Sequence, residues 1–141
     1  MATFVDTSAL YAVLDAADPN HKRAAALWRT LLEREDALIT TNYVVVESVA
    51  LLQSRHGFAV ARRFVEDVLP VIEVVWIDES LHVAATAAWL AAARRSLSIV
   101  DCASFAVMRA RGFRRAFAFD QHFDEQGFSP GGPDGVKGRS A

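Results

Sequence analysis

Cysteine and long hydrophobic runs are what this sequence most clearly lacks. Its one cysteine, Cys102, cannot form an internal disulfide, which excludes a small domain held together by disulfides. The apolar stretch at 68–75 is interrupted by Pro70 and Glu73 and falls far short of the roughly 20 residues that span a bilayer. The first residues also lack the basic stretch and apolar segment of a secretory signal peptide. We therefore expect a cytoplasmic protein with no membrane span.

Lysine and net charge are scarce as well. Of the 15 basic residues only Lys22 and Lys137 are lysines, and the formal net charge is −2. This balance does not by itself indicate a nucleic-acid-binding protein. A guanidinium group suits bidentate contact with phosphate, although arginine pairs are also common on solvated helix faces. Contact with RNA and simple exposure are both open for the three arginine pairs, Arg62-Arg63, Arg94-Arg95 and Arg114-Arg115.

The 141 residues, 52% of them hydrophobic and 23% charged, suffice for one domain with a buried core. Short β-rich runs predict strands at 3–6, 37–41, 72–77 and 116–119. Periodicity and propensity predict helices at 9–14, 18–35, 42–55, 58–68, 79–95, 98–111 and 121–126. The residues expected to cap the first three helices are Thr7-Ser8, Asp18 and Asn42.

This alternation of strands and helices favours an α/β fold with a parallel sheet covered by helices on both faces. We place the domain at residues 1–128. The segment 129–141 contains Gly131-Gly132-Pro133 and Gly135, so we expect it to be a flexible C-terminal tail.

Three aspartates lie where an open α/β sheet gathers its functional groups. Asp6 ends the first predicted strand, Asp120 ends the fourth, and Asp101 is in the first turn of the helix that starts at Ser98. The carboxyl ends of parallel strands meet at one edge of the sheet, where ligands bind. Each aspartate also has a structural interpretation as a turn or cap residue, and the spacing from Ser98 to Asp101 fits a capping box. Both interpretations stay open for each residue taken singly.

Glu47 is harder to explain structurally, because it lies within the apolar segment 44–52. A buried carboxylate needs a partner, and no basic residue lies three or four positions away. Either a distant arginine or a cation must supply the positive charge.

A cluster of these four acids would require a cation. Each like-charge pair costs about 4 kcal/mol at 4 Å and an effective dielectric near 20. Oxygen ligands suit Mg²⁺ or Mn²⁺, whereas zinc calls for clustered cysteine and histidine. Cys102 has no second cysteine, and the histidines are dispersed in the sequence, at His21, His56, His82 and His122. A metal among carboxylates can activate water and hydrolyse a phosphodiester without a protein nucleophile.

Four motifs together resemble the PIN-domain family, and most closely its VapC-like toxins. They are Val5-Asp6-Thr7-Ser8, Glu47 in the third long helix, Leu97-Ser-Ile-Val-Asp101 and Phe119-Asp120-Gln-His-Phe123. The resemblance covers residues 4–128. It implies a three-layer α/β/α sandwich, an endoribonuclease dependent on Mg²⁺ or Mn²⁺, a homodimer, and a cognate antitoxin protein that neutralises the toxin.

By this resemblance Asp6, Glu47, Asp101 and Asp120 would hold the metal and carry catalysis. Thr7 or Ser8 would contact the metal through water, and Asp124 would add negative charge nearby. Many members have an arginine where this chain has Gln121, which bears on substrate contact and leaves the acids intact.

Three other functions compete with this one. A phosphoacceptor receiver domain needs a lysine near the end of its last strand, and neither lysine of this chain is so placed. An aspartyl phosphatase would have a second aspartate two residues after Asp6, where this chain has Ser8. A non-catalytic PIN-like module that binds RNA or protein is the serious alternative, but the presence of all four acids favours the enzyme.

Overall fold

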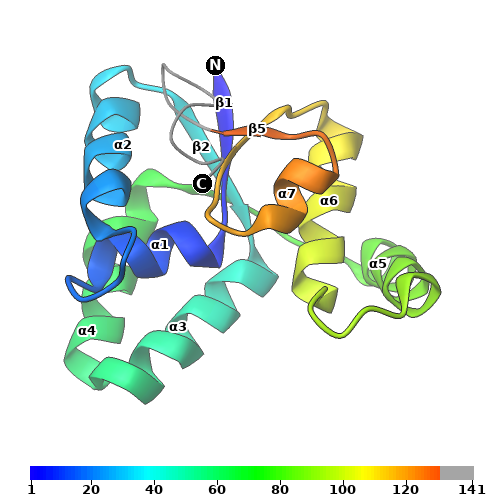
Figure 1. Ribbon diagram of the computed structural model, residues 1–141, viewed down its shortest axis with the longest axis horizontal. Coiled ribbons are helices and arrows are strands. Elements are labelled where there is room, and N and C mark those ends of the chain that lie inside the picture. Colours follow the sequence, from blue (N-terminus) through cyan, green and yellow to red (C-terminus); the bar gives the residue numbers. More distant parts are fainter. Residues whose placement is uncertain (131–141) are drawn as a thin grey trace.

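The computed structural model describes residues 1–130, so residues 131–141 of the expected tail lie outside the described residues (Figure 1). The strands are β1 (Ala2–Val5), β2 (Ala37–Thr41), β3 (Glu73–Val75), β4 (Arg115–Phe117) and β5 (Ser129–Pro130). The helices are α1 (Thr7–Leu14), α2 (His21–Glu33), α3 (Asn42–His56), α4 (Phe58–Arg63), α5 (Glu79–Ala92), α6 (Ile99–Arg111) and α7 (Gln121–Glu125). Between α4 and β3 the chain forms a π-helical turn, η1 (Phe64–Val68), and a 3₁₀ turn, η2 (Leu69–Val71).

The five strands form one parallel sheet in the order β3-β2-β1-β4-β5. The chain steps from β1 to β2 and on to β3, then returns to the other side of β1 with β4. Right-handed crossovers therefore place the two sets of helices on opposite faces. Figure 1 shows α1, α2 and α4 on one side of the strands and α5, α6 and α7 on the other. The predicted three-layer α/β/α fold is confirmed.

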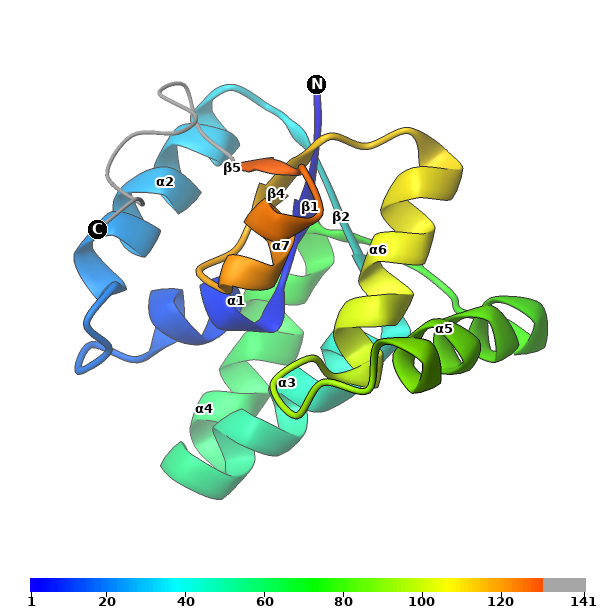
Figure 2. The ribbon, with the colours of Figure 1, turned by 45° about the vertical axis from the view of Figure 1, so that its right-hand side comes forward.

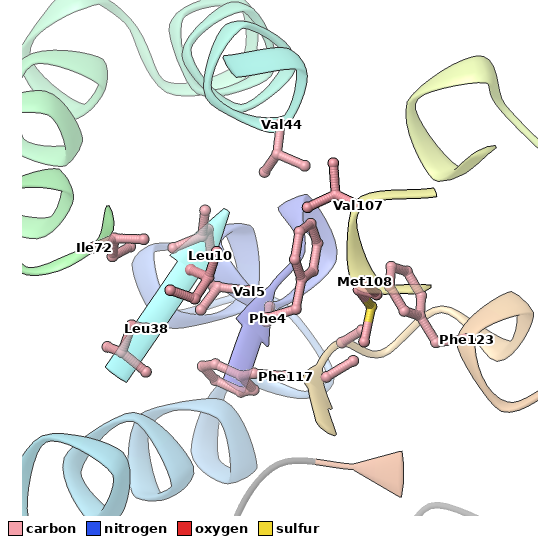
Figure 3. Packing of buried hydrophobic residues seen from close by; sticks show 14 of the residues in the cluster. Phe4, Val5, Leu10, Leu38, Val44, Ile72, Val107, Met108, Phe117 and Phe123 are labelled. Atoms are coloured by element: carbon pink, nitrogen blue, oxygen red, sulfur yellow. The ribbon is translucent and has the colours of Figure 1, made fainter. Parts of the chain in front are cut away.

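The core is built around β1, the central strand. Phe4 and Val5 are fully buried, as a strand covered on both faces requires. Figure 3 shows Phe4 directed toward Val107 and Met108 of α6, and Val5 directed toward Leu10 of α1. Because successive side chains of a strand point to opposite faces, these two residues join both helical layers to the sheet.

The carboxyl ends of the strands lie at one level. Thr41, the last residue of β2, pairs with Val75, the last of β3, and the backbone N–H of Asp6 donates to the carbonyl oxygen of Phe117 at 3.1 Å. Helix α3 packs against both α1 and α6 at this edge (Figure 2). The order in which strands are added to the sheet reverses between β1 and β4, and this switch point is where open α/β sheets bind ligands.

Two of the predicted helix caps are displaced by one residue. The cap of α1 is Asp6 rather than Thr7-Ser8, and the cap of α3 is Thr41, whose hydroxyl accepts from the backbone N–H of Val44 at 3.2 Å. Asn42, the predicted cap, instead accepts a 2.6 Å hydrogen bond from the backbone N–H of Ile77. A contact across 35 residues thus outweighs the local capping preference of asparagine.

Two helix boundaries also differ from prediction. Helix α2 begins at His21, three residues after the expected cap Asp18, because the Asp18 carboxylate accepts from the backbone N–H of Asn20 in a turn. Helix α5 ends at Ala92 instead of Arg95, because Ala93 takes a left-handed conformation with φ of 50°.

The start of the expected tail is ordered into a strand. Ser129 and Pro130 pair in parallel with Arg115 and Ala116 of β4, so the sheet has one more strand than the four predicted. Within residues 1–130, none of the helices combines the length and apolar character that crossing a membrane would demand.

The Asn42 contact provides a test of how α3 is attached to the sheet edge. Asn42→Ala should lower the free energy of unfolding by about 1–2 kcal/mol, because the Ile77 N–H loses its acceptor in a largely buried position. Asn20→Ala is the matched control, since Asn20 caps α2 without a side-chain hydrogen bond. Urea denaturation of both variants measures the difference, and equal losses would show that the Asn42 contact contributes nothing.

Candidate functional site

Asp6 lies where β1 ends and α1 begins, and it is only 3% exposed. Its Oδ2 accepts hydrogen bonds from the backbone N–H of Ser8 at 3.1 Å and from the Ser8 hydroxyl at 2.7 Å. Burial raises the pKa of Asp6 to about 7; the Ser8 hydrogen bonds oppose this, and the charges of Asp101 and Asp120 reinforce it. The ionised carboxylate therefore needs positive charge nearby.

Ser8 joins the end of β1 to the segment that follows β4. Its hydroxyl donates to Asp6 and accepts from the backbone N–H of Phe119 at 2.9 Å. Phe119 directly precedes Asp120, so this one hydroxyl holds two of the predicted acids near each other. The family resemblance implies a water-mediated metal contact for Thr7 or Ser8, which stays a prediction; the Ser8 hydroxyl itself is hydrogen-bonded within the protein.

Asp101 is in the first turn of α6 and is 6% exposed. The capping box expected from the sequence is present: Asp101 Oδ2 accepts from the backbone N–H of Ser98 at 3.2 Å, and the Asp101 N–H donates to the Ser98 hydroxyl at 3.0 Å. Burial and the nearby charge of Asp120 raise the pKa of Asp101. Capping and ligand binding are compatible, since among the described residues the cap engages only one carboxylate oxygen.

Asp120 caps α7, and its Oδ1 accepts from the backbone N–H of His122 at 2.9 Å. It is half-buried. One potential ligand atom from each of Asp101, Asp120 and His122 lies within 4.8 Å of the other two. Since both aspartates also raise the pKa of Asp6, three predicted acids gather at the crevice between β1 and β4.

His122 is a residue that the sequence analysis missed, because it was counted among dispersed histidines. It is 3% exposed, with Nδ1 3.1 Å from Glu125 Oε1 and Nε2 3.1 Å from the carbonyl oxygen of Ser96. Burial alone would lower the pKa of His122, but the Glu125 hydrogen bond, the charges of Asp120 and Asp101 and the Ser96 carbonyl outweigh it, so this pKa is raised. The sequence feature that could have identified His122 is its position two residues after Asp120.

Glu47 is half-buried on α3, less enclosed than its apolar segment suggested. Next to it, the Ser48 hydroxyl donates to the Thr7 hydroxyl at 3.3 Å, which places this turn of α3 against the start of α1 beside Asp6. Glu47 is not part of the close group of ligand atoms, and among the described residues its carboxylate makes no hydrogen bond or ion pair. Its role as a metal ligand stays a prediction.

The aspartate group fits a hard divalent cation. Carboxylate oxygens are the ligands that Mg²⁺ and Mn²⁺ prefer, and the raised pKa values of Asp6 and Asp101 mean that a nearby positive charge would favour their ionised forms. Asp6, Asp101 and Asp120 could hold such an ion.

The arginine pairs differ in their relation to this group. Arg94 and Arg95 follow α5 and line a surface hollow of about 430 Å³ with Trp89, Leu90 and Ala93. Arg94 forms a 2.9 Å ion pair with Glu125 of α7, the helix that Asp120 caps. This pair is therefore linked directly to a helix of the site.

Titration of Asp6 should appear in the stability of the metal-free protein. In the unfolded chain the Asp6 carboxyl group has a pKa of 3.8, whereas in the folded protein its pKa is about 7. The folded state therefore binds more protons between these values, and the free energy of unfolding should fall as pH rises from 5 to 6.5. His122 adds little slope there, because the stability that a raised histidine pKa contributes is lost only as pH rises above the ordinary value of 6.5. Asp6→Asn should flatten the curve, leaving the smaller slope due to Asp101.

Denaturation at several pH values in the presence of EDTA measures this dependence. Asp67→Asn is the control, since Asp67 is an exposed residue of η1 and its variant should follow the wild-type curve. Parallel curves for wild type and Asp6→Asn would show that Asp6 is ionised in the metal-free protein.

Comparison with known proteins agrees with this geometry. A family model described as PIN domain matches residues 3–129. The 23S rRNA-specific endonuclease VapC20 of Mycobacterium tuberculosis is 35% identical over 127 residues, which cover 89% of this chain and 94% of that protein. Its crystal structure, described as that of a Sarcin-Ricin loop cleaving toxin, matches with a TM-score of 0.80 and 33% identity over 91% of this chain and 96% of that one.

A more distant structure shares the fold alone. FitAcB from Neisseria gonorrhoeae matches with a TM-score of 0.63 and 15% identity, covering 90% of this chain and 93% of that chain. The family match and the VapC20 identity both span most of the chain and confirm the resemblance drawn from its acidic motifs. The chain therefore belongs to the PIN-domain family.

Proposed function

We propose that this protein is a Mg²⁺- or Mn²⁺-dependent endoribonuclease and the toxin of a toxin–antitoxin pair. The observation that carries the proposal is the gathering of Asp6, Asp101 and Asp120 at the crevice between β1 and β4, where their burial calls for a cation. The relative VapC20 is named for cleavage of 23S rRNA, which makes structured ribosomal RNA the substrate class to test first.

The chain's own residues hold the acids in place for this chemistry. Ser8 holds Asp6, Ser98 holds Asp101, and the backbone N–H of His122 holds Asp120, so these carboxylates cannot turn away from one another without losing hydrogen bonds. A bound divalent cation would supply Lewis acidity and a nucleophilic water at neutral pH. With the acids preorganised, little rearrangement is needed when the cation and substrate bind.

Cleavage of a defined RNA tests the proposed activity. The purified protein should cut an RNA that contains the sarcin-ricin loop in the presence of Mg²⁺ or Mn²⁺, and EDTA should stop the reaction. Asp101→Asn should reduce cleavage at least about 100-fold, since one ligand is lost while the cap that uses a side-chain oxygen is kept. Binding of this RNA without cleavage at any divalent metal concentration would favour the non-catalytic module instead.

Thermal melts of the same variant test the metal site without reference to activity. In EDTA, Asp101→Asn should melt at or above the wild-type temperature, because it removes one of several like charges. With metal the order should reverse: a ligand at a hundredfold excess over its dissociation constant stabilises the wild type by about 2.7 kcal/mol, and the variant much less. A variant less stable than wild type in EDTA that still cleaves RNA would contradict the assignment of Asp101.

The Arg94-Arg95 pair is proposed to contact the RNA backbone. Arg95→Gln in a cleavage-dead Asp101→Asn background should lower the slope of log affinity against log salt by about 0.7–0.9 for the one phosphate contact removed. Arg62→Gln is the control, because Arg62 is exposed on α4 and paired with Glu66. Filter binding at several salt concentrations measures the slopes, and identical slopes for all three proteins would remove Arg95 from the RNA path.

A cognate antitoxin and a second copy of this chain complete the proposal, both from the family resemblance. Helix α5 contributes the exposed apolar residues Val83, Trp89 and Leu90, which a protein partner would cover. Trp28, by contrast, packs against the core, stacked on Phe117 with ring centroids 6.4 Å apart.

A further inference from the structure

The loop between α5 and α6, residues 93–98, is fastened to α7 by a chain of polar contacts. Arg94 Nη1 lies 2.9 Å from Glu125 Oε1, and the same oxygen lies 3.1 Å from His122 Nδ1. On the other side of the ring, His122 Nε2 lies 3.1 Å from the carbonyl oxygen of Ser96. His122 is therefore the centre of a network that joins two segments 26 residues apart.

Both ring nitrogens of His122 face oxygens that only accept hydrogen bonds. A carbonyl has no proton to give, and the hydrogen bond from Arg94 holds the pKa of Glu125 below its usual range, so this carboxylate accepts as well. Donation from both ring nitrogens would satisfy both contacts, and a nitrogen that donates has no lone pair for a metal. Although the ring lies within 4.8 Å of oxygens of Asp101 and Asp120, this arrangement does not present it as a ligand.

The network reaches both Asp101 and Asp120, which flank it. Ser96 is two residues before Ser98, whose backbone N–H and hydroxyl form the capping box with Asp101. At the other end, the backbone N–H of His122 donates to Asp120 Oδ1 at 2.9 Å. One residue thus fixes the start of α6 through its ring and the carboxylate of Asp120 through its backbone.

We propose that His122 is a positioning residue that sets the separation of Asp101 and Asp120 by locking the α5–α6 loop to α7. Glu125 holds the His122 ring, and Arg94 holds Glu125. The inference rests on the proposed metal-dependent function, and it assigns His122 a place beside the metal ligands rather than among them. Residues that orient ligands in this way typically change metal affinity or activity 10–100-fold when removed.

Nuclear magnetic resonance distinguishes a positioning histidine from a ligand. In ¹⁵N-labelled metal-free protein, His122 should show two ring N–H signals, and both should persist when Mg²⁺ is added to saturation. Loss of the Nε2 or Nδ1 proton on Mg²⁺ binding would identify the ring as a ligand and overturn the proposal. Saturation is judged by shifts of the Asp101 and Asp120 backbone amides in the same spectra.

Metal affinity of variants tests the positioning role itself. By calorimetry with Mn²⁺, His122→Ala should bind about 10–100-fold more weakly than wild type with unchanged stoichiometry. Glu125→Ala should weaken binding in the same direction, and Glu125→Gln should restore most of it, because the glutamine oxygen can still accept from His122 Nδ1. In RNA cleavage these losses should appear in kcat more than in KM. Glu125 is a surface residue of α7, so its two variants keep the test decisive if His122→Ala fails to fold.

The matched control is His56→Ala. His56 joins α3 to α1, because its Nε2 lies 3.0 Å from the Tyr11 hydroxyl and 3.6 Å from Asp15 Oδ2. This similar network lies near the C-terminal end of α1, at the opposite end of that helix from Asp6. Its loss should lower the melting temperature and leave Mn²⁺ affinity unchanged. If His122→Ala and the Glu125 variants behave in this same way, the network is only structural and the proposal is wrong. Absence of Mn²⁺ binding by the wild type would instead overturn the proposed function, and the positioning role with it.

Discussion

The convergence of three carboxylates at the starts of three helices is the constraint on which the rest of the structure depends. Asp6 caps α1, Asp101 lies in the first turn of α6, and Asp120 caps α7. Each accepts a hydrogen bond from a backbone N–H at the start of its helix, and the partial positive charge of a helix N-terminus offsets part of the mutual repulsion. The reversal of strand order between β1 and β4 brings these helix starts together.

This arrangement makes the site a source of instability in the metal-free protein. Burial raises the pKa values of Asp6 and Asp101, so ionising them in the folded state costs free energy. The carboxylates cannot relax toward solvent, because Ser8 and Ser98 bind them to the backbone of neighbouring segments. Groups whose charges repel and whose positions are fixed are typical of a functional site, where the arrangement that function needs lowers local stability.

The sequence predicted what depends on pattern and topology, and missed what depends on contacts distant along the chain. Asp6 and Asp120 were identified because strand ends meet at one sheet edge in any parallel α/β fold. The α3 cap was misplaced because Thr41 and Asn42 both suit that position, and only the contact with Ile77 decides between them. His122 was missed for the same reason: its partner Ser96 is 26 residues away, and no local pattern records that contact.

Arg94 and Arg95 show how a structure separates residues that the sequence treats alike. Both are arginines at the end of one helix, and both line the same surface hollow. Arg94 is paired with Glu125, which also holds His122, whereas Arg95 is exposed and makes no ion pair within residues 1–130. An RNA phosphate that engaged Arg94 would compete with Glu125 for its positive charge and act on the α5–α6 loop, while one that engaged Arg95 would leave this network intact. Contact with substrate and placement of the acids are therefore coupled through Arg94 and separable at Arg95.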